Sequence, residues 1–266
     1  MNIELLLQFL ALGSFVGVMA GLLGIGGGLI VVPALVSWLL PQAGVDDNIV
    51  MHVALGTSLA TIILTSGSSA FNHLKLGNVD LFVVKWLLPG VVIGGAAGSF
   101  IAEAIPSQYL IKVFGVIVLL LALQMLISIK ATKVYPMPSQ PVTLLSGSTI
   151  GVLSSLAGIG GGSLTVPFLS RHGVEMRKAI GSSSVCGCVI AIAGMGGFIL
   201  NGAQAEGLPE YSLGYVYLPA LFGIVATSML TTRLGAKLAS RLPTAVLKKI
   251  FALFLLFIAC RMLLPL

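Results

Sequence analysis

The sequence contains very little charge. Only 8% of its 266 residues are Asp, Glu, Lys or Arg, whereas 57% are hydrophobic and the mean hydropathy is +1.10. About a quarter of the residues in soluble domains are charged, so a water-soluble protein of this length is excluded. Apolar stretches of about 20 residues, the length that crosses a bilayer, occur at 3–23, 81–102, 108–129 and 244–264. The composition therefore predicts an all-α polytopic membrane protein embedded in the lipid bilayer.

The residues that several functional classes require are also missing. The three cysteines, Cys186, Cys188 and Cys260, lie in apolar segments and provide no disulfide framework. The sequence has no His-Glu-x-x-His motif, no Cys-x-x-Cys pair and no histidine cluster, so we expect no metal and no cofactor. Lys and Arg residues are scattered between the apolar segments, which excludes a nucleic-acid-binding surface.

Acidic residues are absent from the interior of every apolar segment. Glu103 lies at the end of one segment, and the other Asp and Glu residues fall in loops or near the N-terminus. Proton-coupled transporters usually carry a carboxylate or histidine within the membrane, and a pathway for cations needs acidic groups. The absence therefore favours a permeant with negative charge.

An internal repeat divides the chain. Residues 13–35 and 147–169 align without gaps and are identical at 13 of 23 positions, including a Gly-Ile-Gly-Gly-Gly run in each. Weaker matches follow in the same order along both halves. We therefore expect a first membrane repeat at 1–130 and a second at 141–266, joined by a linker at 131–140.

Each repeat contains five predicted helical segments. They are 3–23, 27–40, 50–71, 81–102 and 108–129 in the first repeat, and 141–157, 161–170, 178–201, 213–232 and 244–264 in the second. The second segment of each repeat is too short to cross the bilayer comfortably, and it follows a glycine run that disfavours a continuous helix. We predict that the first two segments of each repeat form a broken hairpin with its tip at the glycines. Whether the hairpin spans the membrane or re-enters it is left open.

The distribution of basic residues predicts the topology. Threading ten segments places twelve of the fourteen Lys and Arg residues on the side of the linker, and only Lys112 and Arg261 on the other side. Basic residues concentrate on the cytoplasmic side of membrane proteins. We therefore expect a multi-pass protein of the cell inner (plasma) membrane with a cytoplasmic linker and both termini outside. An odd number of segments inverts the second repeat relative to the first, as in many secondary transporters.

The two glycine runs are the leading candidates for a substrate site. Close helix packing is the simpler interpretation of such glycines. Unwound backbone at membrane depth, however, leaves N–H groups free, and the helix that follows directs its positive end at them, which suits an anion. The predicted substrate-binding glycines are Gly26, Gly27 and Gly28 in the first repeat and Gly160, Gly161 and Gly162 in the second.

Hydroxyl residues occur at matching positions early in the third segment of each repeat. They are Thr57 and Ser58 in the first repeat and Ser182 and Ser183 in the second. Hydroxyls in membrane helices often bond to a neighbouring helix, but as neutral donors they also suit a small oxyanion that must be released. His52 and Arg177 precede these pairs on opposite membrane faces. Each is either an interfacial residue or part of an entrance for anions.

The doubled pattern G-[IL]-G-G-G-x₄-P, at 24–33 and 158–167, is followed in each repeat by a Gly-Thr/Ser-Ser element. Together these motifs resemble the sulfite exporter TauE/SafE family over essentially the whole chain. The resemblance implies a bacterial inner-membrane permease for small sulfur-containing anions, such as sulfite, sulfoacetate or related organosulfonates. We expect it to export them by alternating access.

Alternative functions stay open at this point. The same fold could form an uncoupled anion channel, or a permease that imports a different small anion. An intramembrane enzyme would need a nucleophile and a base at similar depth, and no histidine accompanies the buried Cys and Ser residues, so we expect no enzymatic activity. A homodimer is one expectation for the assembly state.

Overall fold

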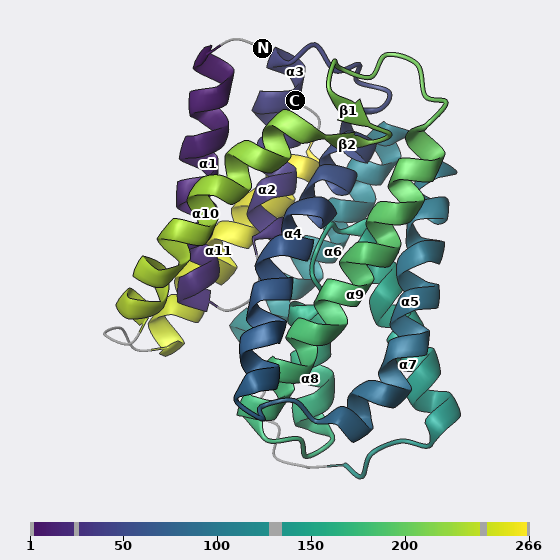
Figure 1. Ribbon diagram of the computed structural model, residues 1–266, viewed down its shortest axis with the longest axis vertical. Helices are drawn as coiled ribbons and strands as arrows, with labels where there is room; N and C mark the ends of the chain where they lie inside the picture. The colour runs from purple at the N-terminus through teal and green to yellow at the C-terminus, as the bar shows by residue number, and fades with distance from the viewer. Residues whose placement is uncertain (1–2, 24–26, 128–134, 240–243, 265–266) are drawn as a thin grey trace.

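The computed structural model describes residues 3–23, 27–127, 135–239 and 244–264, which form ten helical segments and one short β-hairpin (Figure 1). The first half contains α1 (Ile3–Leu23), one continuous helix made of α2 (Gly28–Ala34), the π-helical turn η1 (Leu35–Leu39) and α3 (Leu40–Gln42), and then α4 (Val50–Lys75), α5 (Leu81–Glu103) and α6 (Ser107–Ile127). The second half contains α7 (Gln140–Leu156), α8 (Gly162–Arg171), α9 (Met176–Gly202), β1 (Ser212–Leu213), β2 (Val216–Tyr217), α10 (Leu218–Ala239) and α11 (Thr244–Leu263). The prediction of an all-helical architecture is confirmed.

The predicted segments agree with the observed helices to within a few residues, with one exception. The segment predicted at 213–232 begins too early, because α10 starts only at Leu218. Residues 212–217 instead form the antiparallel β1–β2 hairpin, which turns at Gly214 with φ +54°. Pro219 then stands in the first turn of α10, where its missing N–H costs little because first-turn N–H groups have no intrahelical acceptor.

Helix lengths and surface chemistry fit a bilayer. Within the described residues, α1, α4, α5, α6, α9 and α10 are long and apolar enough to cross a membrane. By contrast, α8 has 10 residues and is about 15 Å long at the helical rise of about 1.5 Å per residue, half of the hydrocarbon thickness of about 30 Å. Large apolar side chains such as Leu7, Phe100 and Phe257 are exposed, as lipid-facing residues are. The chain is thus a multi-pass membrane protein in which α8 is long enough to cross only about half of the bilayer.

Each of the five most extensive helix contacts joins one helix from each half. The pairs are α1 with α10, α5 with α7, α4 with α9, α5 with α9, and α6 with α11. In Figure 1, the α1–α10 pair and the α5–α7 pair lie on opposite sides of α4 and α9. Glycines permit the closest approaches: a Cβ added at Gly13 would clash with the Ile224 carbonyl oxygen, and one at Gly147 would lie 2.8 Å from the Leu87 carbonyl oxygen. Small residues in the first segment of each half therefore allow close helix packing.

The short helices of the two halves extend toward opposite ends of the molecule (Figure 1). The α2–α3 helix runs toward the end that carries the β-hairpin, whereas α8 runs to the other end. There, the N–H of Tyr135 donates to the carbonyl oxygen of Arg171 at 3.0 Å, and the Arg171 guanidinium lies 5.1 Å from the centre of the Tyr135 ring. The chain that enters the second half is therefore attached to the end of α8.

Candidate functional site

The start of α2 meets the second glycine turn between α4 and α9. A Cβ added at Gly28, the first residue of α2, would clash with the carbonyl oxygen of Gly158, and Ile62 of α4 lies 3.0 Å from the same position. A Cβ added at Gly187 of α9 would clash with the carbonyl oxygen of Gly160. The backbones therefore approach as closely as only glycine allows. We refer to Gly28, Ile62, Gly158, Gly160 and Gly187 as the glycine junction.

The glycine junction lies near the middle of the two longest helices. Ile62 is close to the midpoint of α4, which has 26 residues, and its Cγ2 lies 2.8 Å from the position that a Cβ at Gly160 would take. Ile190 is close to the midpoint of α9, which has 27 residues, and its Cδ1 lies 2.7 Å from the corresponding position at Gly161. Helices of this length are about 40 Å long and cross the hydrocarbon core completely. The second glycine turn therefore lies at the depth of the bilayer centre.

The predicted glycines have different surroundings. Gly26 lies outside the described residues, and Gly27 faces α1, where a Cβ would clash with Val16. Gly161 has φ +67°, a left-handed conformation that favours glycine, and Gly162 begins α8. Packing alone accounts for Gly27 and for Gly28 at the junction, so a substrate role for these residues stays a prediction.

Ser58 and Ser183 are both hydrogen-bonded to carbonyl oxygens. The Ser58 hydroxyl donates to the carbonyl oxygen of Gly158 at 2.9 Å, which attaches the middle of α4 to the second glycine turn. The Ser183 hydroxyl donates within its own helix to Ile180 at 2.9 Å. Ser58 is therefore placed at the glycine junction, whereas Ser183 is satisfied locally.

Thr57 and Ser182 occupy equivalent positions in the two halves. Thr57 Oγ1 accepts a hydrogen bond from the N–H of Tyr217 at 3.0 Å, one residue before α10. Ser182 Oγ accepts one from the N–H of Asp80 at 2.9 Å, one residue before α5. The preceding glycines, Gly56 and Gly181, touch the carbonyl oxygens of Tyr215 and Asn78, each two residues before the donor. Each hydroxyl thus holds the segment that enters the fourth helix of the opposite half.

Four buried hydroxyls around the second glycine turn have no hydrogen-bond partner among the described residues. They are those of Ser154, Ser155, Ser163 and Thr165. Roughly nine-tenths of buried polar groups have a partner, and leaving one unpaired costs about 1–3 kcal/mol. The aligned positions of the first repeat hold Ala20, Gly21, Leu29 and Val31. The identities between the repeats do not mark these hydroxyls, because each stands at a position where the two repeats differ.

Two of these hydroxyls converge on the start of α8. Ser154 Oγ and Thr165 Oγ1 lie 3.7 and 3.5 Å from the position that a Cβ at Gly161 would take, and both residues are wholly buried. Ser155 points elsewhere, because its Oγ lies 2.8 Å from the corresponding position at Gly194 of α9. The start of α8 therefore combines a helix N-terminus with two hydroxyls that have no partner.

The two predicted entrance residues lie in different environments. His52 is buried, with Nε2 3.0 Å from the Ala102 carbonyl oxygen and its ring 5.2 Å from that of Tyr215. The Tyr215 hydroxyl in turn donates to Glu103 at 3.1 Å. Arg177 is exposed near the start of α9. His52 does not reach the aqueous surface in this structure, and an entrance role for either residue stays a prediction.

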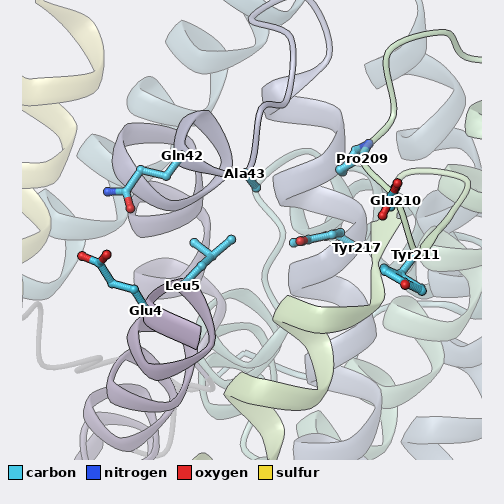
Figure 2. Close-up of a pocket in the computed structure, with 8 residues that line it drawn as sticks. All are labelled: Glu4, Leu5, Gln42, Ala43, Pro209, Glu210, Tyr211 and Tyr217. Carbon is cyan, nitrogen blue, oxygen red and sulfur yellow. The ribbon is translucent and has the colours of Figure 1, made fainter. Parts of the chain in front are cut away.

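A pocket of about 280 Å³ lies at the end of the molecule that carries the β-hairpin. Figure 2 shows the residues that line it, from α1, the end of α3 and the chain around the hairpin: Glu4, Leu5, Gln42, Ala43, Pro209, Glu210, Tyr211 and Tyr217. Burial and the negative charge of Glu210 raise the pKa of the Tyr217 phenol. None of the predicted site residues lines this pocket, but Tyr217 connects it to Thr57 through the backbone hydrogen bond described above.

The fold and the broken hairpins define a multi-pass helical membrane protein with helix ends buried at mid-depth. The chain belongs to the sulfite exporter TauE/SafE family, whose sequence pattern matches residues 9–262. The resemblance inferred from the doubled glycine motif is thereby confirmed. The family is one of transporters and not of enzymes.

Relatives of this chain occur in bacteria and archaea. It is 44% identical over 258 residues to a probable membrane transporter protein of Haemophilus influenzae, with 97% of each chain covered. It is 29% identical over 252 residues to a probable membrane transporter protein of Methanocaldococcus jannaschii, covering 91% of this chain and 92% of the relative. The probable membrane transporter protein YunE of Bacillus subtilis is 25% identical over 270 residues, with 94% of each chain covered. No solved structure matches the chain significantly.

Proposed function

We propose that this membrane transporter carries small sulfur-containing anions, such as sulfite, sulfoacetate or related organosulfonates, out of the cell across the inner membrane by alternating access. The proposal is carried by one observation: a glycine turn about halfway along the two longest helices, with a helix N-terminus and buried hydroxyls beside it. Hydrogen-bond donors and a helix N-terminus suit an anion. The family description supports a sulfur oxyanion as cargo.

An inverted relation between residues 1–130 and 141–266 is part of this proposal. Its support is the exchange of partners between the halves, because α1 packs on α10 while its counterpart α7 packs on α5. The hydrogen bonds follow the same pattern, because Thr57 accepts from the residue before α10 and its counterpart Ser182 accepts from the residue before α5. Such exchange is expected when a two-fold axis relates two repeats, and the opposite directions of the α2–α3 helix and α8 favour an axis in the membrane plane (Figure 1). Transporters with inverted repeats work by rocking one set of helices around a central site.

An uncoupled anion channel is the second candidate. Backbone contact at the glycine junction favours a carrier, because Gly28 touches Gly158 and Gly187 touches Gly160, so a path through this point requires the helices to move apart. A channel needs no such movement for each ion that passes.

The two candidates are separated by flux measurements on purified protein in liposomes. We expect efflux of sulfite that saturates with concentration and is stimulated by sulfite on the opposite side, with protein-free liposomes as the baseline. Single-channel currents carried by the same anions would support the channel instead. Absence of saturable flux for sulfite, sulfoacetate and methanesulfonate would overturn the proposed cargo class.

A further inference from the structure

The donors at the start of α8 come from the second hairpin. Ser154 and Thr165 place their unpartnered, wholly buried hydroxyls within 3.7 Å of the Cβ position at Gly161. The N–H groups of Leu164 and Thr165 both donate to the Gly161 carbonyl oxygen. Those of Gly162 and Ser163, earlier in the same turn, have no intrahelical acceptor. Two hydroxyls and two N–H groups are therefore offered at one place.

The first hairpin has no matching set. At the positions aligned with Ser154 and Thr165 it carries Ala20 and Val31, which have no polar side-chain atoms. Its second helix, α2, begins at Gly28, which is pressed against the Gly158 carbonyl oxygen. Both hairpins offer first-turn N–H groups, because the N–H groups of Ile30 and Val31 donate to Gly27 in the same way, but the two hydroxyls belong to α7 and α8.

Charged side chains lie far from this place along every neighbouring helix. The ionisable residues of these helices are His52, His73 and Lys75 of α4, Lys85 and Glu103 of α5, Arg171 of α8, and Arg177, Lys178, Cys186 and Cys188 of α9, while α7 has none. His52 is ten residues from Ile62 and Arg171 is ten residues from Gly161, or about 15 Å along the helix axis. The two thiols are the nearest of these groups, and Cys188 Sγ contacts the Ile63 carbonyl oxygen at 3.9 Å.

A site without a cationic side chain discriminates by charge. The cost of removing an ion from water rises with the square of its charge, so a dianion such as sulfate, with both charges on one group, loses about four times as much solvation as a monoanion of similar size. The helix N-terminus offers about half an elementary positive charge. Such a site can compensate one negative charge far better than two.

We propose that Ser154, Thr165 and the first-turn N–H groups of α8 form the anion-binding site, and that it accepts a sulfur oxyanion group that carries a single negative charge. This inference rests on the proposed function. It selects hydrogensulfite over the sulfite dianion, two forms that interconvert near neutral pH. It also selects methanesulfonate, a permanent monoanion, over sulfate, which carries two charges on one group.

The test measures the thermal unfolding midpoint of the purified protein against anion concentration, since a ligand of the folded state raises it by mass action. Methanesulfonate should raise the unfolding midpoint saturably, with the same apparent affinity at pH 6 and pH 8. Sulfite should bind several-fold more weakly at pH 8 when its total concentration is counted. Sulfate also stabilises proteins by exclusion from their surface, so the Ser154→Ala/Thr165→Val double variant measures that background for each salt.

Variants assign the site. Ser154→Ala and Thr165→Val should each weaken methanesulfonate binding about ten-fold or more, since a hydrogen bond to a charged group is lost. Thr165→Ser keeps the hydroxyl and should bind like the parent protein. Ser155→Ala is the matched control, because it removes a buried, unpartnered hydroxyl that faces Gly194 instead.

The outcomes separate this inference from the proposed function. Equal methanesulfonate affinity in the parent protein and the double variant overturns the site, and saturable sulfate binding as tight as that of methanesulfonate overturns the charge rule, even where sulfite flux persists. If no sulfur anion crosses the membrane while methanesulfonate still binds at Ser154 and Thr165, the function fails and the site stands. The pH comparison uses the parent protein, so it decides the charge rule even if a variant does not fold.

Discussion

The carbonyl oxygen of Gly158 lies where a Cβ at Gly28 would be. The carbonyl oxygen of Gly160 has the same relation to Gly187 on α9. The second glycine turn is therefore held by backbone contact on two sides, from the first hairpin and from a membrane-spanning helix. Contacts of this kind are how membrane helices associate without a hydrophobic driving force, and they fail as soon as a side chain is added.

Gly187→Ala should destabilise the protein, whereas Gly196→Ala in the same helix should not. A Cβ at Gly187 clashes with the Gly160 carbonyl oxygen, but one at Gly196 meets nothing within 4 Å. Overpacking costs about 1–3 kcal/mol, while alanine is up to about 1 kcal/mol better than glycine in a helix interior. Thermal unfolding in detergent and sulfite flux in liposomes measure both effects. Equal unfolding midpoints for the two variants would contradict a tight contact at Gly187.

Thr57→Val should lower stability and leave anion affinity unchanged. Its hydroxyl oxygen accepts from the buried N–H of Tyr217, and removing the acceptor leaves that N–H unpaired at a cost of about 1–3 kcal/mol. Thr57→Ser keeps the acceptor and serves as the control. Ser182→Ala should have the same effect, because it removes the acceptor for the backbone N–H of Asp80. A large loss of anion affinity at unchanged stability would instead make these hydroxyls ligands, as the sequence predicts.

Stability should fall in alkaline solution partly because of Tyr215, which lies in the β1–β2 hairpin outside the membrane-spanning segments. Burial, followed by the charge of Glu103 and the hydrogen bond to it, raises the pKa of the Tyr215 phenol from 10.0 to about 12. A pKa that is higher in the folded state means that the folded protein favours the protonated phenol. The stabilisation is therefore complete below pH 10 and is lost as the pH rises toward 12.

Denaturation midpoints measured at several pH values from neutral to strongly alkaline test this expectation. Tyr215→Phe should reduce the alkaline loss without removing it, because the pKa of Tyr217 is raised as well. Glu103→Gln should reduce it less, since burial is the larger cause of the shift. An unchanged alkaline slope in Tyr215→Phe would show that the phenol does not titrate in this way.

Much of the fold could be predicted from the sequence because membrane helices can be identified from their local composition. The segment 3–23 coincides with α1, and the two glycine runs mark the breaks before α2 and α8. The predicted start of α10 was wrong because residues 213–217 are mostly apolar, and hydropathy alone does not distinguish a buried hairpin strand from a helix.

The contacts of the site residues could not be predicted, because they join positions far apart in the chain. The repeat pairs Thr57 with Ser182, but nothing in the sequence indicates that each accepts from the segment before a helix in the opposite half. Ser154 and Thr165 are separated by ten residues and a glycine turn, and only the structure brings both hydroxyls beside Gly161. The one signal in the sequence is that the two repeats differ at these positions, since the first repeat has apolar residues there.

The distribution of basic residues predicts the orientation of the protein in the membrane. Twelve of the fourteen Lys and Arg residues fall on the side of the 131–140 linker, which predicts that this side is cytoplasmic. Suitable reporter positions are Ser139, on that side, and Glu206, in the chain before the β-hairpin, because both are exposed. Gly207 is less suitable, since its φ of +75° strains any other residue.

Cysteines at these two positions, introduced into a variant with the native cysteines replaced, should differ in their reaction with a membrane-impermeant maleimide. Replacing the native thiols matters because Cys260 is exposed. We expect Glu206→Cys to be labelled in intact cells, and Ser139→Cys to be labelled only after the inner membrane is opened. Because the two positions lie beyond opposite ends of the helices, one result constrains the other. Labelling of Ser139→Cys alone in intact cells would invert the topology and, with it, the side from which α8 enters the membrane.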